Sequence, residues 1–434
     1  MALQTSGSIA LLDLANEFGG NSPHAVNEYY KGGGLVPDTS TNAGIPTSGQ
    51  VDLNDFYGGD VVSGPSPGYL WSSGRAKHGR LGNNSTTNST VQVQITGGGS
   101  NWLTLSKGRQ HNTALKSDGS YWGWGDNWYG QLMQGAASFG TSGGSTSSPI
   151  REFTNSTWES LHGGSWSAGG IKTDGRLWTA GMGSTGMFGD NTITNYSGSP
   201  IQTVSGGTNW VTSASGGSEI GAVKTDGRLW TWGHNGYGQL GDNTVNHKSS
   251  PIQTVSGGTN WSAVSSGAFG RAFVAIKTDG RLWSWGQGTN GRLGDNTIDH
   301  KSSPLQTVSG GTDWKTASSG SVGTAAIKTD GRLWMWGQGM AGTLGDNNPT
   351  NKSSPVQTVS GGTDWLVPAT GDFIAPQSAG IKTDGRLWVW GGNSYGELGD
   401  GTNTNKSSPI QISGGGTGWQ SVACSEGNTV TIKT

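Results

Sequence analysis

One eight-residue motif, Ile-Lys-Thr-Asp-Gly-Arg-Leu-Trp, returns at regular intervals through most of this 434-residue chain. It stands unchanged or as a close variant at residues 115–122, 171–178, 223–230, 276–283, 327–334 and 381–388. Each half is predicted to form a short strand, and Asp-Gly accepts the left-handed backbone of a tight turn between the two. A unit that recurs about every fifty residues indicates a repeat architecture.

The two halves of the motif also occur alone, at opposite ends of the repeat region. Residues 69–71 supply a second half without a first, and residues 432–434 a first half without a second. We therefore expect strand 69–73 to pair with the end of the chain and to complete a last sheet whose other strands come from the C-terminus. Seven units are present, each with four strands, as at 251–255, 260–264, 273–278 and 281–285. The sequence predicts an all-β fold, a seven-bladed β-propeller without open sheet edges.

The tryptophans are interpreted as packing residues between blades. The chain has 21 Trp and 80 Gly with only 12% charged residues, a composition typical of a turn-rich all-β protein. Paired rings such as Trp230 and Trp232 fall on one face of a strand, and stacking against a sugar is their alternative role. Asp242 and its equivalents are expected to cap turns rather than to bind a cation, because no second carboxylate accompanies them: Asp295, Asp346 and Asp400.

Composition and motifs argue against several classes of function. The net charge is −2 and no basic run is present, so nucleic-acid binding is not expected. No apolar segment has the length of a membrane span, and the single cysteine, Cys424, is expected to be a small buried residue. The histidines are scattered, and no metal motif, nucleophile motif or phosphate-binding loop occurs. We therefore expect no enzymatic activity, no metal and no cofactor, and keep a glycan-cleaving enzyme as a minor alternative.

Residues 64–434 resemble the regulator-of-chromosome-condensation propeller family. The resemblance rests on the Leu-Trp-x-Trp-Gly hairpins and the Gly-x-Leu/Phe-Gly turns at a spacing of 51–56 residues. It implies the seven-bladed fold. Members of that family act in nucleotide exchange, enzyme inhibition or scaffolding, so it does not select one function. Exchange activity is not expected here, because no inserted hairpin wedge interrupts the repeats and no basic tail precedes them.

Residues 1–63 contain none of this repeat and are predicted to form a separate module, mainly helical or irregular. Ser6–Leu14 and Ser48–Phe56 are a duplication, and each copy ends in an aromatic residue followed by Gly-Gly. Sixty residues rarely bury enough surface to be stable alone. The apolar residues of the module are therefore expected either to fold back on the propeller as a cap or to attach the chain to a larger assembly: Ile9, Leu11, Leu14, Phe18, Tyr29, Tyr30, Val51, Leu53, Phe56 and Tyr57.

The duplicated segment resembles N-terminal segments of structural proteins from tailed bacteriophages, notably those of marine and cyanobacterial hosts. The resemblance covers residues 5–59 and includes Pro-Thr-Ser-Gly at 46–49. It implies a non-enzymatic virion protein, a tail fibre, spike or appendage subunit made in the host cytoplasm and present in several copies. Residues 1–63 would contact other virion proteins, and the propeller loops a host-surface glycan or protein.

Three loops depart from the regular spacing and are candidate contact surfaces. The expected contact residues are aromatic or charged: Trp128, Phe139, Phe269, Arg271, Asp372 and Phe373. Neutral variation in loop length is the alternative interpretation. The competing function is a soluble propeller that binds another protein, as exchange factors and the propeller-type β-lactamase inhibitor do, with residues 1–63 dispensable.

Overall fold

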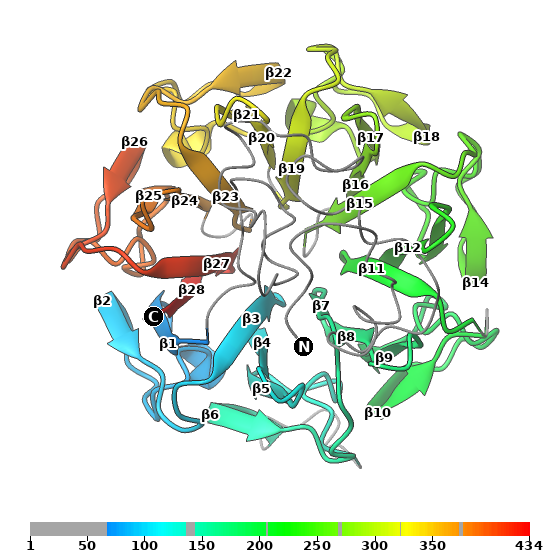
Figure 1. The fold of residues 1–434 in the computed structure, drawn as a ribbon, viewed down its shortest axis with the longest axis horizontal. Helices are drawn as coiled ribbons and strands as arrows, with labels where there is room; N and C mark the ends of the chain where they lie inside the picture. The colour runs from blue at the N-terminus through cyan, green and yellow to red at the C-terminus, as the bar shows by residue number, and fades with distance from the viewer. Residues whose placement is uncertain (1–66, 136–143, 205–206, 268–270, 322, 373–375) are drawn as a thin grey trace, which may run out of the picture. The chain divides into compact units, whose positions relative to one another are not determined.

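The computed structural model describes residues 67–135, 144–204, 207–267, 271–321, 323–372 and 376–434. Within these residues, 28 strands form seven four-stranded antiparallel sheets around one axis (Figure 1). The predicted N-terminal module and its expected helices lie outside the described residues, as do the ten apolar residues named for it. No helix in the described ranges is long and apolar enough to cross a membrane.

Each sheet is one blade, and its strands are called A to D from the axis to the rim. The blade that holds both ends of the propeller, the closing blade, has as A to D β27 (Trp419–Ser425), β28 (Asn428–Lys433), β1 (Tyr69–Gly74) and β2 (Ser89–Gln94). The next two blades have β3 (Trp102–Lys107), β4 (His111–Lys116), β5 (Tyr121–Gly125) and β6 (Thr146–Arg151), then β7 (His162–Gly163), β8 (Ser167–Ile171), β9 (Leu177–Met182) and β10 (Tyr196–Gln202).

The four remaining blades follow the repeat most regularly. They contain β11 (Trp210–Ser215), β12 (Glu219–Lys224), β13 (Leu229–Gly233) and β14 (Lys248–Gln253); β15 (Trp261–Ser266), β16 (Ala272–Lys277), β17 (Leu282–Gly286) and β18 (Lys301–Gln306); β19 (Trp314–Ser319), β20 (Gly323–Lys328), β21 (Leu333–Gly337) and β22 (Lys352–Gln357); and β23 (Trp365–Thr370), β24 (Gln377–Lys382), β25 (Leu387–Gly391) and β26 (Lys406–Gln411). Short 3₁₀ turns are η4 (Lys77–Gly79), η6 (Thr289–Gly291) and η7 (Met340–Gly342).

The ring closes as the isolated half-motifs predicted, with one correction. β1 pairs with β28 from Tyr69 opposite Lys433 to Gly74 opposite Asn428, which confirms the expected pairing of residues 69–73 with the chain end. The expectation that the other strands all come from the C-terminus is wrong. β2 is the D strand of the same sheet, so each end of the propeller contributes two strands.

The Asp-Gly turn shows why the repeated motif has its sequence. In the β16–β17 hairpin, Gly280 has a φ of +75°, and the Asp279 carboxylate accepts the Arg281 N–H at 3.0 Å. A Cβ at Gly280 would collide with the Thr312 carbonyl oxygen at the start of the next blade. Glycine is therefore required both for the backbone conformation and for the close approach of two blades.

The core lies between the blades, and in five hairpins the second Trp is among its largest fully buried residues. Trp285 is 0% exposed, its ring stacks on Phe273 at a centroid distance of 5.6 Å, and its N–H donates to the Gln239 carbonyl of the preceding blade at 2.8 Å. Trp232 makes the same bond to the Met187 carbonyl at 2.9 Å. These contacts confirm the interpretation that the rings pack neighbouring blades together.

In six blades the first Trp of the hairpin is only partly buried and is covered by the motif lysine. Lys277 lies over the rings of both Trp261 and Trp283, with its ammonium 4.6 and 4.7 Å from the two centroids. Equivalent pairs of rings accommodate five further lysines: Lys116, Lys172, Lys224, Lys328 and Lys382. The lysine stem thus shields apolar ring surface while its charge interacts with the ring faces.

Candidate functional site

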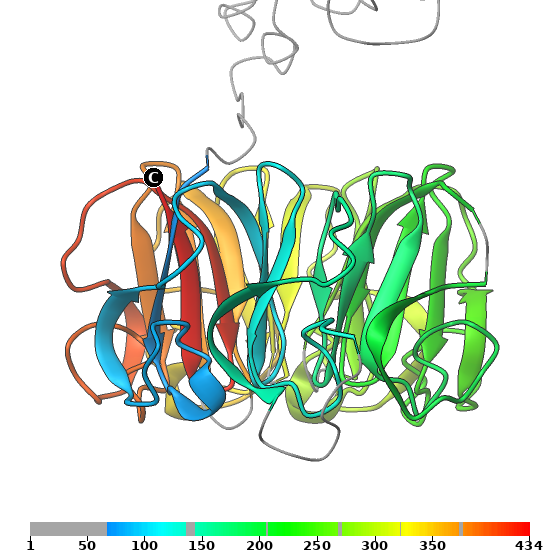
Figure 2. The same cartoon turned by 90° about the horizontal axis from the view of Figure 1, so that it is seen from below.

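The turns that join A to B strands and C to D strands open on one face of the disc, which is called the loop face. The opposite face carries the Asp-Gly hairpins and the D-to-A connections and is called the hairpin face; in Figure 2 it is the upper side, where the C-terminus is marked. Because the loop face holds the long C-to-D loops, it is where the sequence has most freedom to vary. The predicted contact loops belong to this face.

Three arginines on the loop face stack on aromatic rings of a neighbouring blade. The guanidinium of Arg109 lies 5.4 Å from the ring centroid of Trp166. Arg75 lies over Tyr395 at 4.9 Å and Arg271 over Tyr237 at 5.1 Å, the latter also donating to the Tyr237 hydroxyl at 2.8 Å. Each pair fixes a flat, charged surface across a blade boundary, a geometry suited to contact with another molecule.

One buried carboxylate holds two of these arginines. Glu426, in the turn between β27 and β28, is 2% exposed and accepts Arg75 Nη1 at 2.7 Å and Arg109 Nε at 2.6 Å. Gln110 Nε2 donates to the same carboxylate at 3.2 Å, and Arg80 Nη1 donates to the Glu426 backbone carbonyl at 2.5 Å. Three guanidinium groups thus gather around Glu426, and Asp126 is a second carboxylate that acts electrostatically on Arg80.

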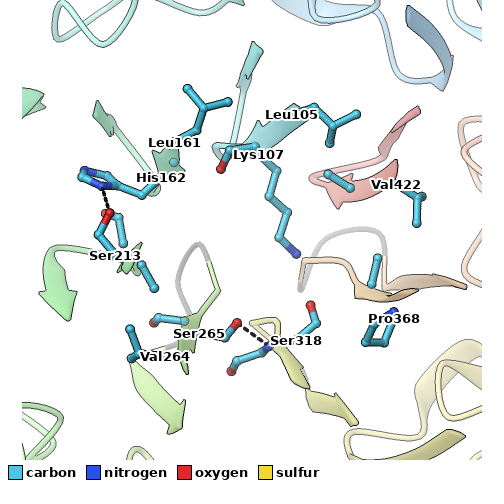
Figure 3. Close-up of a pocket in the computed structure, with 18 residues that line it drawn as sticks. Leu105, Lys107, Leu161, His162, Ser213, Val264, Ser265, Ser318, Pro368 and Val422 are labelled. Atoms are coloured by element: carbon cyan, nitrogen blue, oxygen red, sulfur yellow. Dashed lines mark hydrogen bonds between the residues drawn. The ribbon is translucent and has the colours of Figure 1, made fainter. Parts of the chain in front are cut away.

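The innermost strands surround a hollow on the axis of the disc, which is called the axial channel (Figure 3). A cavity of about 210 Å³ within it is lined by residues from the A strands of all seven blades or the turns next to them. The Lys107 side chain extends into this space and its ammonium donates to the Thr370 backbone carbonyl. Burial lowers the pKa of Lys107, while Cys424 and Asp372 oppose that shift. The channel therefore contains a desolvated cation among serine hydroxyls.

Buried titratable groups near the channel are held by structural contacts. His162 Nδ1 lies 2.9 Å from the Ser213 hydroxyl, and burial lowers the pKa of His162 to about 3, so its ring is neutral at pH 7. The Glu219 carboxylate accepts the N–H groups of Gly217 and Ser218 at 3.2 and 3.0 Å, and burial raises the pKa of Glu219. The space beside Glu219 is about 40 Å³, which is enough for a water molecule and too small for a substrate.

The Asp-Asn turns of the loop face act as structural caps, as expected. Asp242 accepts the N–H of Thr244 at 3.1 Å and the amide of Asn235 at 3.0 Å, and Lys248 lies 3.4 Å from it. Among the described residues, no group of three or more His, Cys, Asp or Glu side chains is placed to hold a metal ion. Cys424 is 0% exposed, and burial raises its pKa to about 11.

The predicted contact residues fall into three groups. Trp128 is 40% exposed on the loop face, and Arg271 is the arginine stacked on Tyr237. Asp372 is 2% exposed and acts electrostatically on the channel lysine, so it does not form an outer contact surface. Three predicted residues lie outside the described residues: Phe139, Phe269 and Phe373.

Sequence reasoning missed Glu426, the two arginines paired with it (Arg75 and Arg109) and the channel lysine, Lys107. For Arg109 and Glu426, the sequences of the A-to-B turns contained a signal. Residues 108–111 read Gly-Arg-Gln-His and residues 425–427 read Ser-Glu-Gly, whereas residues 215–218 read Ser-Gly-Gly-Ser. Charged residues in an otherwise small and polar turn mark these two positions.

Comparisons with known proteins agree with this architecture. Residues 226–274, 279–327 and 384–432 match the Regulator of chromosome condensation (RCC1) repeat. Ultraviolet-B receptor UVR8 of Arabidopsis thaliana is 28% identical over 324 residues, which are 71% of this chain and 69% of UVR8. E3 ubiquitin-protein ligase HERC2 of Homo sapiens is 26% identical over 66% of this chain, but the match spans only 6% of HERC2.

Two solved structures have the same fold. Human WBSCR16 superposes with a TM-score of 0.72 at 20% identity, covering 84% of this chain and 100% of that one. Prp20p of Saccharomyces cerevisiae gives a TM-score of 0.72 at 17% identity, covering 85% and 92% of the two chains. The repeat matches and the blade topology agree. This chain thus contains a seven-bladed β-propeller, and three of its segments match the repeat of the regulator of chromosome condensation.

Proposed function

We propose that this chain is a non-enzymatic propeller that binds another protein through its loop face. The observation that carries the proposal is the set of arginines stacked on aromatic rings across blade boundaries, at Arg75, Arg109 and Arg271. Arginine, tyrosine and tryptophan are the residues that contribute most to protein interfaces. Because the rings and Glu426 already hold two of these arginines in place, little side-chain entropy is lost when a partner binds.

The similar proteins support this proposal over the virion interpretation. Prp20p has been characterised for binding to Gsp1p and histones, and yeast RCC1 (Prp20) has been crystallised bound to Kap60. The guanidinium groups of Arg75 and Arg109, whose side chains are each 21% exposed, suit a partner surface that presents carboxylates. Attachment to a phage particle depends on residues 1–63, which are outside the described residues, and stays a prediction from sequence.

Two double variants, each of which replaces two arginines with glutamine, test whether the loop face binds the partner. The full-length chain is used as bait in its unaltered form, as Arg109→Gln/Arg271→Gln, and as the control Arg228→Gln/Arg332→Gln. The control removes two exposed hairpin-face arginines, each paired with an aspartate at 2.6 Å. A direct partner is identified by crosslinking and mass spectrometry, and its Kd is then measured with purified components.

We expect the loop-face variant to lose at least about 2 kcal/mol of binding free energy, a thirtyfold rise in Kd, and the control to change by less than threefold. Equal loss in both variants would contradict the proposal. A third variant, Phe18→Asp/Phe56→Asp, tests the competing interpretation. If it alone abolishes capture and the captured chains are virion proteins, the attachment module and not the loop face performs the binding function.

A further inference from the structure

One side chain closes the C-to-D loop at the same place in five blades. It stands twelve residues after a backbone N–H of the same loop and accepts a hydrogen bond from that group. In three of these blades the acceptor is an asparagine oxygen: Asn88 for Ala76 at 3.0 Å, Asn351 for Gly339 at 3.1 Å and Asn405 for Asn393 at 2.9 Å. An amide oxygen does not titrate, so these three loops are closed by a bond that does not depend on pH.

In two adjacent blades a histidine takes the place of this asparagine. His247 Nδ1 accepts the Asn235 N–H at 2.9 Å, and His300 Nδ1 accepts the Gly288 N–H at 3.1 Å. Because both donors are backbone N–H groups, Nδ1 must carry a lone pair, and the proton of the neutral ring lies on Nε2. A second proton on the ring places one donor opposite another and breaks the bond. These two loops are therefore closed by bonds that acid removes.

A third histidine strengthens this effect in the first of the two loops. The His234 ring lies against the His247 ring, with a centroid distance of 4.5 Å and an angle of 32° between the planes. Gln239 Oε1 accepts the Tyr237 N–H at 2.9 Å, which orients the amide so that its Nε2 donates to His234 Nδ1 at 2.7 Å. Burial, with His247 and Arg271, lowers the pKa of His234 to about 4. A proton on His234 thus costs a hydrogen bond and repels a charged His247.

The charged groups around the three rings come from several elements. Glu219 of β12 and Arg271, which precedes β16, line the same small cavity as His234. Burial raises the pKa of Glu219, so this carboxylate also takes up a proton more readily than an exposed one. The aspartates of the two loops are paired with lysines: Asp242 with Lys248 at 3.4 Å, and Asp295 and Asp299 with Lys301 at 3.4 and 3.6 Å. Because aspartates titrate near pH 4, the histidines and Glu219 change charge first as the pH falls.

Tyr237 lies between the two loops and holds the loop-face arginine. The His300 ring meets the Tyr237 ring at 89° with a centroid distance of 5.0 Å, and the His234 ring lies 6.3 Å from it. Arg271 stacks on the same ring and donates to its hydroxyl. Arg271 has a φ of +43°, a left-handed backbone that its surroundings must stabilise because it is unfavourable for a residue with a Cβ. Opening of the loops would therefore release Arg271.

We propose that the C-to-D loops at residues 234–247 and 287–300 are an acid-sensitive part of the loop face, closed at neutral pH and opened when their histidines take up protons. Opening frees Tyr237 and Arg271, and so weakens binding of a partner at this side of the disc. The effect on binding rests on the proposed function, whereas the opening itself does not. The sign follows from His234: its pKa is lowered in the closed loop, so closure is favoured above about pH 6.5 and loses stability as the pH falls toward about 4.

Hydrogen exchange of single backbone amides tests the opening without a partner. Exchange is measured by NMR on the full-length protein and divided by the intrinsic rate at each pH, which gives a protection factor. We expect the protection of the Asn235 and Gly288 amides to fall at least about tenfold between about pH 7.5 and pH 5, because a histidine that must stay neutral weakens closure by up to about tenfold per pH unit below about 6.5. The Gly339 and Asn393 amides, which asparagine closes, are controls in the same molecule and should change by less than about threefold.

The matched variant, His234→Gln/His247→Asn/His300→Asn, introduces residues that other blades already have at these positions, such as Gln338 and Asn351. It keeps the hydrogen-bond acceptors but removes the titrating rings, so the Asn235 and Gly288 amides should stay protected at pH 5. Equal loss of protection at all four amides of the unaltered protein would overturn the proposal. A pH response that persists in the variant would assign it to Glu219 and would also overturn it. If the loops open in acid but the Kd of an identified partner does not change, the opening stands and the role of Arg271 in binding is refuted.

Discussion

Replacing Glu426 with alanine removes the carboxylate that joins three parts of the ring. Arg75 follows β1 near the start of the propeller, Arg109 belongs to the next blade, and Glu426 lies in the last hairpin. The variant keeps both guanidinium groups and leaves them near the buried Arg80, for which Asp126 is then the carboxylate that remains. Repulsion among the three arginines then adds to the loss of hydrogen bonds.

The magnitude follows from burial. Removing one partner of a fully buried ion pair costs about 3–5 kcal/mol, and an exposed pair contributes about 0–1 kcal/mol. Glu426 is 2% exposed, while the Arg75 and Arg109 side chains are each 21% exposed and stay partly solvated. We therefore expect Glu426→Ala to lower the free energy of unfolding by about 3 kcal/mol, near the lower end of the buried range.

Urea unfolding followed by tryptophan fluorescence measures this change. The control is Arg332→Ala, which removes one partner of the exposed pair with Asp330, in which the side chains are 47% and 38% exposed. It should cost no more than about 1 kcal/mol. If the two variants lose equal stability, Glu426 does not hold the closing blade together, and the clustering of arginines around it has another cause. A double variant, Glu426→Ala/Arg109→Ala, should recover part of the loss because it relieves the repulsion.

Three further predictions follow from the same contacts. His162, whose pKa is lowered to about 3 by burial, is neutral when folded and protonates near pH 6.5 when unfolded, so stability present above pH 6.5 is lost as the pH falls toward 3. His162→Asn should reduce the slope of unfolding free energy against pH by up to about 1.4 kcal/mol per unit in this window, as measured by urea titrations at several pH values. Gly280→Ala should cost at least about 2 kcal/mol because its Cβ meets a carbonyl oxygen, whereas Gly257→Ala, with open space around the Cβ, should cost about 1 kcal/mol. Cys424, with its pKa raised to about 11, should react with a thiol reagent only after unfolding, and reaction of the native protein at pH 7 would contradict its burial.

The blade count, the hairpins and the pairing of the two ends could be predicted because each has a local sequence signal. The period of the motif gives the number of blades, and the Asp-Gly turn requires backbone geometry that few other residues accept. The place of β2 was missed because Gln92 stands where other rim strands have proline, so the strand lacked the recognisable repeat sequence.

The site was harder to predict because its residues are far apart in the chain. Arg75 and Glu426 are 351 positions apart, and only the closure of the ring brings them together. Loop length alone identified Trp128 and Arg271, which remain accessible. Loop length could not show that Asp372 is buried while Trp128 and Arg271 are accessible. Burial depends on the blades that surround a loop and not on the length of the loop.

The shared closing blade has a consequence for the synthesis of the chain. β1 and β2 leave the ribosome first among the propeller strands, yet the edge of β1 finds its partner only when β28 has been made. Until then an apolar strand with unpaired backbone groups is open to other chains. The closure of the ring therefore depends on the last strands. A product that stops before β27 cannot close the disc and should be degraded or aggregate. A full-length product completes the disc when these last strands pair.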